Sequence, residues 1–219
     1  MTITKFPPHE DADESGILAL GGDLEVPSLL LAYKNGIFPW PISIEHPLAW
    51  FSPDPRGVLM IKDLHISKSF QKFLKSSNWK IKFNHSFHQV IQRCAFADNR
   101  KDQTGTWITP QVIKSYIDFY NAGYAFSVET YQDNNLIGGL YGIKVGRYVA
   151  GESMFYLQSH ASKFALYHLM KKLEQENIEW LDTQMVTPLT SSFGAVEIER
   201  DRFLNMHKEV INQETFTFS

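Results

Sequence analysis

The sequence has a single cysteine, no long apolar segment and no strong net charge. With only Cys94 among 219 residues, the chain cannot form an internal disulfide bond, and a zinc site built from cysteines is excluded. No run of residues approaches the roughly 20 apolar residues that a membrane-spanning helix requires, and the first residues lack the apolar core of a secretion signal. We therefore expect a cytoplasmic protein with no membrane partner, and we take a monomer as the working hypothesis.

The formal net charge of −3 excludes the overall basic field that many nucleic-acid-binding proteins carry. Any contact with nucleic acid must therefore be local. A run of lysines offers one such place, although a solvated helix face is the simpler interpretation. These are Lys62, Lys68, Lys72, Lys75, Lys80 and Lys82.

Common catalytic signatures are missing as well. The sequence contains no GxGxxG, Walker A, HExxH or GxSxG motif, so nucleotide-binding, zinc-protease and serine-hydrolase mechanisms have no support. His85 and His88 lie three positions apart, but no third ligand accompanies them. We expect no metal and no cofactor.

What is present is a patterned stretch from Leu136 to Gln184. Two apolar, strand-like segments are joined by a glycine turn at 144–147 and should form an antiparallel hairpin. A helix with an apolar face begins near Ala161, and a strand carrying Asp182 and Gln184 follows it. Side chains two positions apart leave the same face of a strand, so these two should lie together.

The order strand–strand–helix–strand is compatible with an acetyltransferase-type (GNAT-type) domain, in which Glu152 and Asp182 would flank one cleft. A structural interpretation stays open, because glycines in strands often mark bulges and an Asp at a strand end is often a cap. A coenzyme A enzyme also needs a glycine-rich loop before the helix to cradle pyrophosphate. Ala161 and Lys163 break that signature, so we expect a different acyl donor.

The first 56 residues differ in character from the rest. Prolines punctuate the aromatic segments 38–41 and 50–56, which must be extended. A short helix should begin at Pro27 and end at Asn35-Gly36. We expect an α+β protein in which a small module, 1–56, with little regular structure packs on a larger α/β domain, 57–219, with a mixed, mainly antiparallel sheet. In the larger domain the sequence predicts strands at 58–61, 79–83 and 125–131, helices at 67–76, 86–97, 110–122 and 201–210, loops at 98–105 and 191–195, and a tail, 212–219, that is either a strand or frayed.

Eight strings of residues resemble the leucyl/phenylalanyl-tRNA–protein transferase family. They occur in the family's order and cover most of the chain, from about Ile17 to Phe203, which makes the resemblance specific. The strings are LALGGDL (18–24), LLAYKNGIFPW (30–40), WFSPDPR (50–56), GTWIT (105–109), GGLYG (138–142), GESMF (151–155), ASK (161–163) and LDTQ (181–184).

The resemblance implies an enzyme that takes leucine or phenylalanine, and less readily methionine, from its charged tRNA. It implies transfer to the N-terminal amine of a protein that begins with Arg or Lys, which marks that protein for degradation by the N-degron pathway. It also implies an acetyltransferase-like catalytic domain, an N-terminal module that contributes to the site for the tRNA 3′ end, and neither coenzyme A nor metal.

Aminolysis of the ester that joins an amino acid to tRNA requires a neutral α-amine. The reference pKa of that amine is about 7.7–8.0, so a useful fraction is neutral near pH 7 and a strong base is unnecessary. By resemblance, Asp182 would orient the amine and accept its proton, and the Gln184 amide would polarise the ester carbonyl. Glu152 and Asp182 are the expected contacts of the acceptor's basic N-terminus.

The remaining expected site residues bind the aminoacyl-tRNA. An aromatic ring stacking on the terminal adenine contributes roughly 1–3 kcal/mol, and the 3′ end should contact Tyr33, Trp40, Trp107, Glu152 and Ser153. Phosphates of the acceptor stem could lie on the lysines of 62–82, which would make binding sensitive to salt. The aminoacyl side chain needs an apolar pocket, for which we expect residues that could equally be ordinary core: Leu140, Val149, Met154, Phe155, Leu169 and Leu181.

Two departures from the family pattern and two alternative functions complete this picture. Leu189 stands where the family usually has a histidine, and 156–158 lack a basic residue often found there.

One alternative is a peptidyltransferase-like enzyme with another acceptor, which substrate competition would distinguish. The other is a protein that binds tRNA ends or basic N-termini without catalysis, against which intact Asp182 and Gln184 argue.

Overall fold

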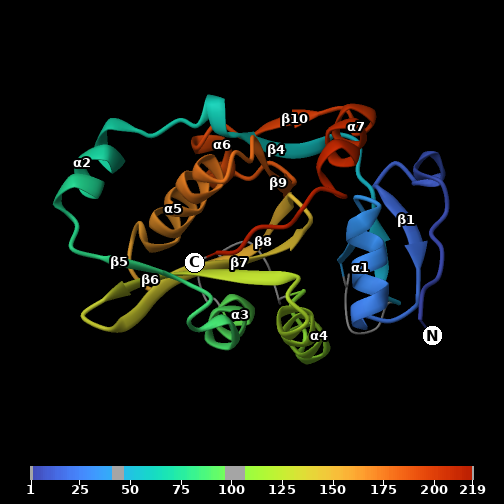
Figure 1. Cartoon of the computed structure of the whole chain (residues 1–219), viewed down its shortest axis with the longest axis horizontal. Coiled ribbons are helices and arrows are strands. Elements are labelled where there is room, and N and C mark those ends of the chain that lie inside the picture. Colours follow the sequence, from blue (N-terminus) through green and yellow to red (C-terminus); the bar gives the residue numbers. More distant parts are fainter. Residues whose placement is uncertain (1, 41–46, 97–106, 219) are drawn as a thin grey trace.

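The computed structural model describes residues 2–40, 47–96 and 107–218 (Figure 1). The predicted charged loop at 98–105 lies outside these residues, as do Pro41 and the first two residues of the GTWIT string.

Seven strands of the described chain form one large sheet in the order β10-β4-β9-β8-β7-β6-β5. Neighbouring strands are antiparallel except β8 and β9, which are parallel. The expected α+β fold with a mixed, mainly antiparallel sheet is therefore confirmed. The strands are β4 (Arg56–Met60), β5 (Lys80–Phe83), β6 (Ala125–Gln132), β7 (Asn135–Val145), β8 (Tyr148–Tyr156), β9 (Trp180–Gln184) and β10 (Val196–Ile198).

Helices cover both faces of this sheet (Figure 1). One face packs against α5 (Ala161–Gln175) and α2 (Lys68–Ser76), and the other against α3 (Phe87–Ala95), α4 (Pro110–Asn121) and α7 (Arg200–Val210). Side chains cap the starts of α2 and α4: the Ser67 side chain accepts a hydrogen bond from the Phe70 N–H, and the Thr109 side chain accepts one from the Val112 N–H.

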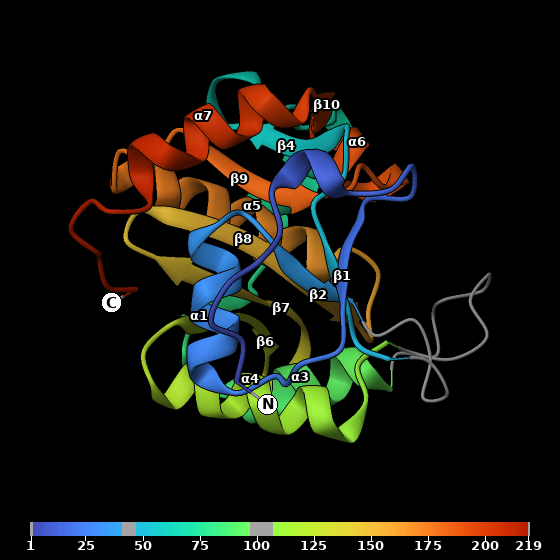
Figure 2. The same cartoon turned by 90° about the vertical axis from the view of Figure 1, so that its right-hand side faces the viewer.

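The N-terminal module holds more regular structure than its sequence predicts. It contains α1 (Val26–Lys34), which ends before Gly36 at a φ of 70°, and a small antiparallel sheet in the order β1-β3-β2. The expectation of little regular structure was wrong because strands of three or four residues are too short to show an alternating pattern. The strands are β1 (Ile17–Leu20), β2 (Phe38–Trp40) and β3 (Ala49–Phe51). Figure 2 looks onto this module, with α1, β1 and β2 in front of the strands of the large sheet.

The module and the larger part of the chain share one hydrophobic core. Buried Tyr33 of α1 stacks on Phe119 of α4 with ring centroids 5.8 Å apart, and buried Trp50 belongs to the same cluster. Strand β4, the first of the large sheet in the chain, starts at Arg56, where we expected the boundary between the two parts.

Three C-terminal features were not anticipated. A short helix, α6 (Pro188–Ser192), follows β9 and overlaps the start of the predicted loop, and β10 follows that loop. Residues 212–218 contain no strand, although Phe216 and Phe218 are buried. Phe218 packs on Phe126 with ring centroids 4.3 Å apart, so the tail is held by aromatic contacts.

The central arrangement follows the predicted order. Strands β7 and β8 form the hairpin, α5 crosses the sheet, and β9 returns parallel to β8. The parallel register joins Ala150 to Asp182 and does not continue along the two strands. Because β8 and β9 separate beyond this pair, the sheet opens at its centre, and the candidate site lies there.

Candidate active site

A cavity of about 290 Å³ occupies the opening between β8 and β9. Its apolar wall consists of leucines from β7, β9 and α5 together with Met154 of β8. Its other end is aromatic and comes from β2 and from Trp107, which lies three residues before the start of α4. The principal lining residues are Leu140, Met154, Leu166, Leu169 and Leu181 on the wall, Phe38, Trp40 and Trp107 at the aromatic end, and the polar Glu152, Ser153, Thr183 and Gln184 between them.

Each of the two separating strands carries one extra residue at the cavity. Opposite β7, the register passes from Gly151 to Ser153 and leaves Glu152 as an inserted residue. Opposite β4, it passes from Asp182 to Gln184 and leaves Thr183 inserted. Such bulges redirect side chains locally, and both inserted residues line the cavity.

Glu152 is held by hydrogen-bond donors from three other elements. Tyr33 donates to Glu152 Oε1 at 2.8 Å and Gln184 Nε2 donates to the same oxygen at 3.0 Å, while Tyr116 donates to Oε2 at 3.3 Å. Burial raises the pKa of this carboxylate to about 7, and the charge of Asp182 adds to the rise, against the lowering effect of the hydrogen bonds. Glu152 can therefore bind or release a proton near neutral pH.

Asp182 is fully buried and does not line the cavity. Arg56 donates to both of its carboxylate oxygens, from Nε at 3.0 Å and from Nη2 at 2.7 Å. Tyr148 donates to Oδ2 at 2.5 Å, and the backbone N–H of Gln184 donates to Oδ1 at 2.8 Å. Four donors thus surround a carboxylate that has room for about four hydrogen bonds.

Gln184 lies at a strained turn. Its φ of 59° is in the left-handed region, which glutamine rarely adopts, and the Met185 N–H donates to the Thr183 carbonyl oxygen at 2.6 Å across it. A turn closed over three residues with positive φ is the rarer, strained form of γ-turn, and such backbone costs on the order of 1–3 kcal/mol. The turn ends β9 and leaves the Gln184 side chain at the cavity beside Glu152.

Most of the predicted site residues come together at this cavity, and four do not line it. Tyr33 and Asp182 are fully buried behind it, where they contact Glu152 and the Gln184 backbone instead. Val149 packs in the core beneath α5, and Phe155 belongs to the core on the opposite face of the sheet. Of the six residues expected to line the aminoacyl pocket, Val149 and Phe155 therefore lie outside it. The predicted residues that line the cavity are Trp40, Trp107, Leu140, Glu152, Ser153, Met154, Leu169, Leu181 and Gln184.

Sequence reasoning missed several residues around the site, chiefly Arg56, Tyr116, Tyr148 and Leu166. One signal for Arg56 was available: it directly precedes the apolar strand residues 57–60, where an arginine that is buried needs an acidic partner. The two tyrosines gave no such signal, because their hydroxyl groups reach the site only through the packing of α4 and β8.

The two tryptophans at the aromatic end contact each other. The ring centroids of Trp40 and Trp107 lie 5.9 Å apart with an angle of 40° between the planes, and both side chains remain partly exposed. Leu189, on α6, lines the cavity at the position where a histidine was expected from the family pattern.

The described ranges offer neither a metal-binding cluster nor a transmembrane helix. Across residues 2–40, 47–96 and 107–218, His, Cys, Asp and Glu side chains nowhere gather in threes so as to hold a metal ion. In the same ranges every helix is too short or too polar to traverse a bilayer.

Comparison with known sequences identifies the class of enzyme. Residues 22–54 match the family described as the leucyl/phenylalanyl-tRNA protein transferase N-terminal domain, and residues 58–208 match the leucyl/phenylalanyl-tRNA protein transferase family. The chain is therefore an aminoacyltransferase.

Individual relatives agree with these matches. A leucyl/phenylalanyl-tRNA–protein transferase of Shewanella halifaxensis is 44% identical over 203 residues, which cover 92% of this chain and 85% of the relative. The protein of the same name from Flavobacterium johnsoniae is 45% identical, with 93% and 95% covered. The chain belongs to the leucyl/phenylalanyl-tRNA–protein transferase family.

A solved structure supports the fold alone. A conserved protein of unknown function from Bacteroides thetaiotaomicron is similar with a TM-score of 0.50 at 10% sequence identity, over 74% of this chain and 59% of that protein.

Proposed function

We propose that this aminoacyltransferase moves leucine or phenylalanine, and less readily methionine, from aminoacyl-tRNA to the N-terminal Arg or Lys of acceptor proteins and so marks them for degradation. One observation carries the proposal. A single cavity joins an apolar wall, a pair of tryptophans and a carboxylate whose pKa is about 7. These three parts match an apolar aminoacyl side chain, the terminal adenine and an attacking amine.

The donor end of the proposal uses the apolar wall and the tryptophans. Leu166 and Leu169 of α5 and Met154 of β8 line a space for an apolar side chain, and methionine adapts to both Leu and Phe. Trp40 and Trp107 offer partly exposed ring surface on which an adenine can stack. The ester carbonyl would then lie between these two regions, next to the Gln184 amide.

On the acceptor side of the proposed reaction, the residue that handles the proton of the attacking amine is Glu152. Attack by the neutral amine forms the C–N bond and breaks the ester C–O bond, and the proton that the amine loses is taken up in the end by the departing ribose oxygen. Glu152 lines the cavity and can carry that proton at neutral pH. We favour Glu152 over Asp182 for this contact because the Asp182 carboxylate already accepts four hydrogen bonds and lies outside the lining.

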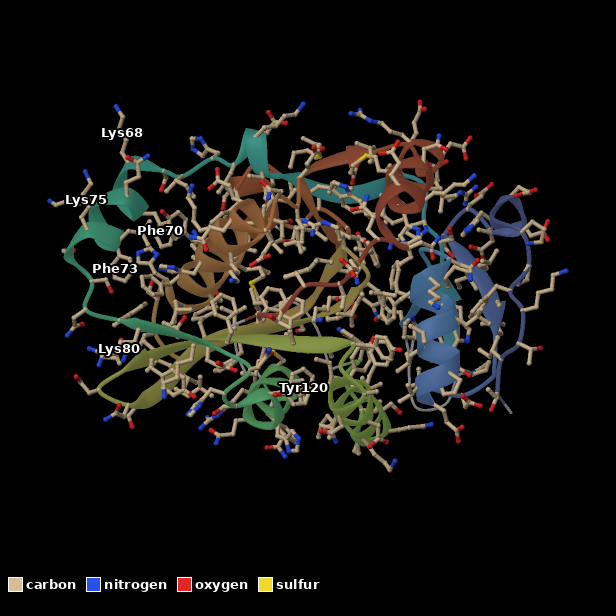
Figure 3. All side chains as sticks on the ribbon, viewed as in Figure 1. Lys68, Phe70, Phe73, Lys75, Lys80 and Tyr120 are labelled. Carbon is tan, nitrogen blue, oxygen red and sulfur yellow. The ribbon has the colours of Figure 1, made fainter. Side chains whose placement is uncertain are left out.

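The tRNA body would be held by the lysines around α2. Lys62, Lys68, Lys72 and Lys75 are exposed, and Figure 3 shows Lys68 and Lys75 pointing away from the protein body while Phe70 and Phe73 point toward α5. The aromatic side of the helix is therefore used for packing, and its lysine side is available to phosphates. Binding through such contacts weakens with rising salt.

The direct test measures transfer of radiolabelled leucine from charged tRNA to a peptide that begins with Arg, beside a matched peptide that begins with Asp. We expect label on the Arg peptide only, and loss of most of that label with Glu152→Ala and Gln184→Ala. Label on the Asp peptide would show that the acceptor has been misassigned. No label on either peptide, with intact binding of charged tRNA, would favour an end-binding protein.

A further inference from the structure

The Asp182 side chain binds the backbone of the strained turn at Gln184. The Gln184 N–H is bound by the carboxylate of Asp182, two residues earlier, at 2.8 Å. A side-chain oxygen that accepts from the backbone two residues on is a recognised way of stabilising a tight turn. The Asp182 carboxylate thus fixes the backbone from which the Gln184 amide reaches Glu152.

Asp182 is itself immobilised by Arg56 of β4. The guanidinium group binds the carboxylate through two nitrogens, at 3.0 and 2.7 Å, and both side chains are about 1% exposed or less. The guanidinium carbon also lies 4.7 Å from the ring centroid of Phe38 and 4.3 Å from that of Phe203. Arginine is suited to this place because its planar fork can bind a carboxylate and stack on rings at once.

The next residue of β4 is a glycine that packs against the same turn. Gly57 is the register partner of Gln184. A Cβ atom added to Gly57 would lie 2.6 Å from the backbone carbon of Met185 and 2.9 Å from the nitrogen of Val186. Any side chain at this position would therefore push the backbone that follows Gln184.

We propose that Arg56, Gly57 and Asp182 are positioning residues that together impose the left-handed turn at Gln184 and so aim its amide into the cavity. Arg56 and Asp182 hold the turn by hydrogen bonds, and Gly57 leaves room for it. Asp182 then acts through the Gln184 backbone and not as the acceptor of the substrate's proton. This inference rests on the proposed function for its kinetic readout, but its structural readout is independent of that function.

The kinetic test is a set of double-mutant cycles with Gln184→Ala, in the leucine transfer assay. We expect Arg56→Lys, which cannot bind through a planar fork, and Gly57→Ala each to lower kcat about 10- to 100-fold, the size that a displacement of about 1 Å can produce. KM for charged tRNA should change less than twofold. In the Gln184→Ala background neither substitution should lower kcat further, because the group that they position is absent. Additive losses would overturn the inference.

Two further variants separate positioning from loss of stability. Leu173→Ala removes buried core of α5 outside the cavity lining, and we expect a lower Tm with an unchanged kcat. If Arg56→Lys does not fold, Gly57→Ala carries the test, because it leaves the Arg56–Asp182 ion pair intact.

A crystal structure of Gly57→Ala gives an answer that does not depend on activity. We expect the φ of Gln184 to leave the left-handed region, or its amide to lose the hydrogen bond to Glu152. An unchanged turn would overturn the inference even if the enzyme transfers leucine. Conversely, a displaced turn in a protein that transfers no leucine to any peptide would support the inference and refute the proposed function.

Discussion

Tyr33, in the N-terminal module, donates a 2.8 Å hydrogen bond to the Glu152 carboxylate in the large sheet. The Tyr116 hydroxyl of α4 lies 3.3 Å from that carboxylate and 2.5 Å from the Tyr33 hydroxyl, and its one proton can be donated to either oxygen. Because burial raises the pKa of both phenols well above their usual value, neither will ionise near neutral pH. The titrating member of this group is Glu152.

The pH profile of Glu152→Gln tests the assignment of proton transfer. Below pH 7 the wild-type enzyme must lose one proton from Glu152 and one from the acceptor amine, so log(kcat/KM) should rise with a slope near two. Between pH 7 and about 8 only the amine remains to titrate, and the slope should fall to one. In Glu152→Gln we expect a rate lower by about 100-fold or more and a slope of one throughout.

A second buried carboxylate serves as the control for that profile. Glu129 is fully buried, accepts from the Ser86 N–H at 3.1 Å, and has a pKa raised by burial, yet it does not line the cavity. Glu129→Gln should keep the slope of two. A Glu152→Gln enzyme with the wild-type profile would remove Glu152 from the proton path.

Stability should depend on pH through two groups that act in opposite directions. The pKa of Glu152 rises from 4.5 to about 7 on folding, so the free energy of unfolding falls as the pH rises through this window. The pKa of His207 falls from 6.5 to about 4 because of burial, so the free energy of unfolding falls as the pH drops through that window. Each effect is on the order of 3 kcal/mol.

Substituting either group should leave only the pH dependence of stability that the other group contributes. We expect Glu152→Gln to lose more stability than wild type between pH 7 and 5, and His207→Gln, which can still donate to the Tyr33 carbonyl oxygen that His207 contacts at 2.9 Å, to gain stability over the same range. Urea unfolding at pH 5, 6 and 7 measures both. Curves that run parallel for the three proteins would contradict the pKa directions.

Substitutions at Trp40 test the site for the terminal adenine. Trp40→Leu removes the ring and should raise KM for charged tRNA about 5- to 150-fold, the equivalent of 1–3 kcal/mol of stacking, with kcat little changed. Trp40→Phe keeps an aromatic ring and should lose much less. Because Trp40 and Trp107 are in contact, the double variant Trp40→Leu/Trp107→Leu should lose less binding free energy for charged tRNA than the sum of the losses in the two single variants. Equal KM values for Trp40→Leu and wild type would place the adenine elsewhere.

The lysines of α2 should determine the salt dependence of tRNA binding. Replacing Lys68, Lys72 and Lys75 with Ala should weaken binding and reduce the slope of log Kd against log salt by a little under one for each phosphate that a lysine no longer neutralises. The exposed Lys34 and Lys208 lie on α1 and α7, and the double Ala variant of these two is the control. An unchanged slope for the triple variant would leave those lysines as a solvated surface.

The sequence predicts the frame of the site better than its details. The hairpin, α5 and β9 follow from local patterns, such as the positive-φ glycine of the turn at Gly146. The bulges that place Glu152 and Thr183 do not, because each depends on the register with a partner strand. In a regular strand, the side chains of Asp182 and Gln184 would lie on one face. Here the inserted Thr183 and the turn at Gln184 place only the Gln184 side chain at the cavity.

The roles of buried residues are the hardest to predict. Tyr33 matches a family position and was expected at the tRNA end, whereas its hydroxyl serves Glu152 from behind. The sequence does not reveal which acidic residue pairs with Arg56, because Asp182 lies 126 positions away in the chain.

The continuous core that runs from Trp50 through Tyr33 to Phe119 has a consequence for how the protein comes apart. The interior of the N-terminal module is continuous with the core on one face of the large sheet, whereas the core beneath α5 belongs to the larger region alone. We therefore expect the module not to unfold while the shared core stays intact. The module is therefore not an independently folding unit. Loosening α1 by heat or denaturant would withdraw a hydrogen bond from Glu152 and disable the catalytic cavity in the same cooperative step.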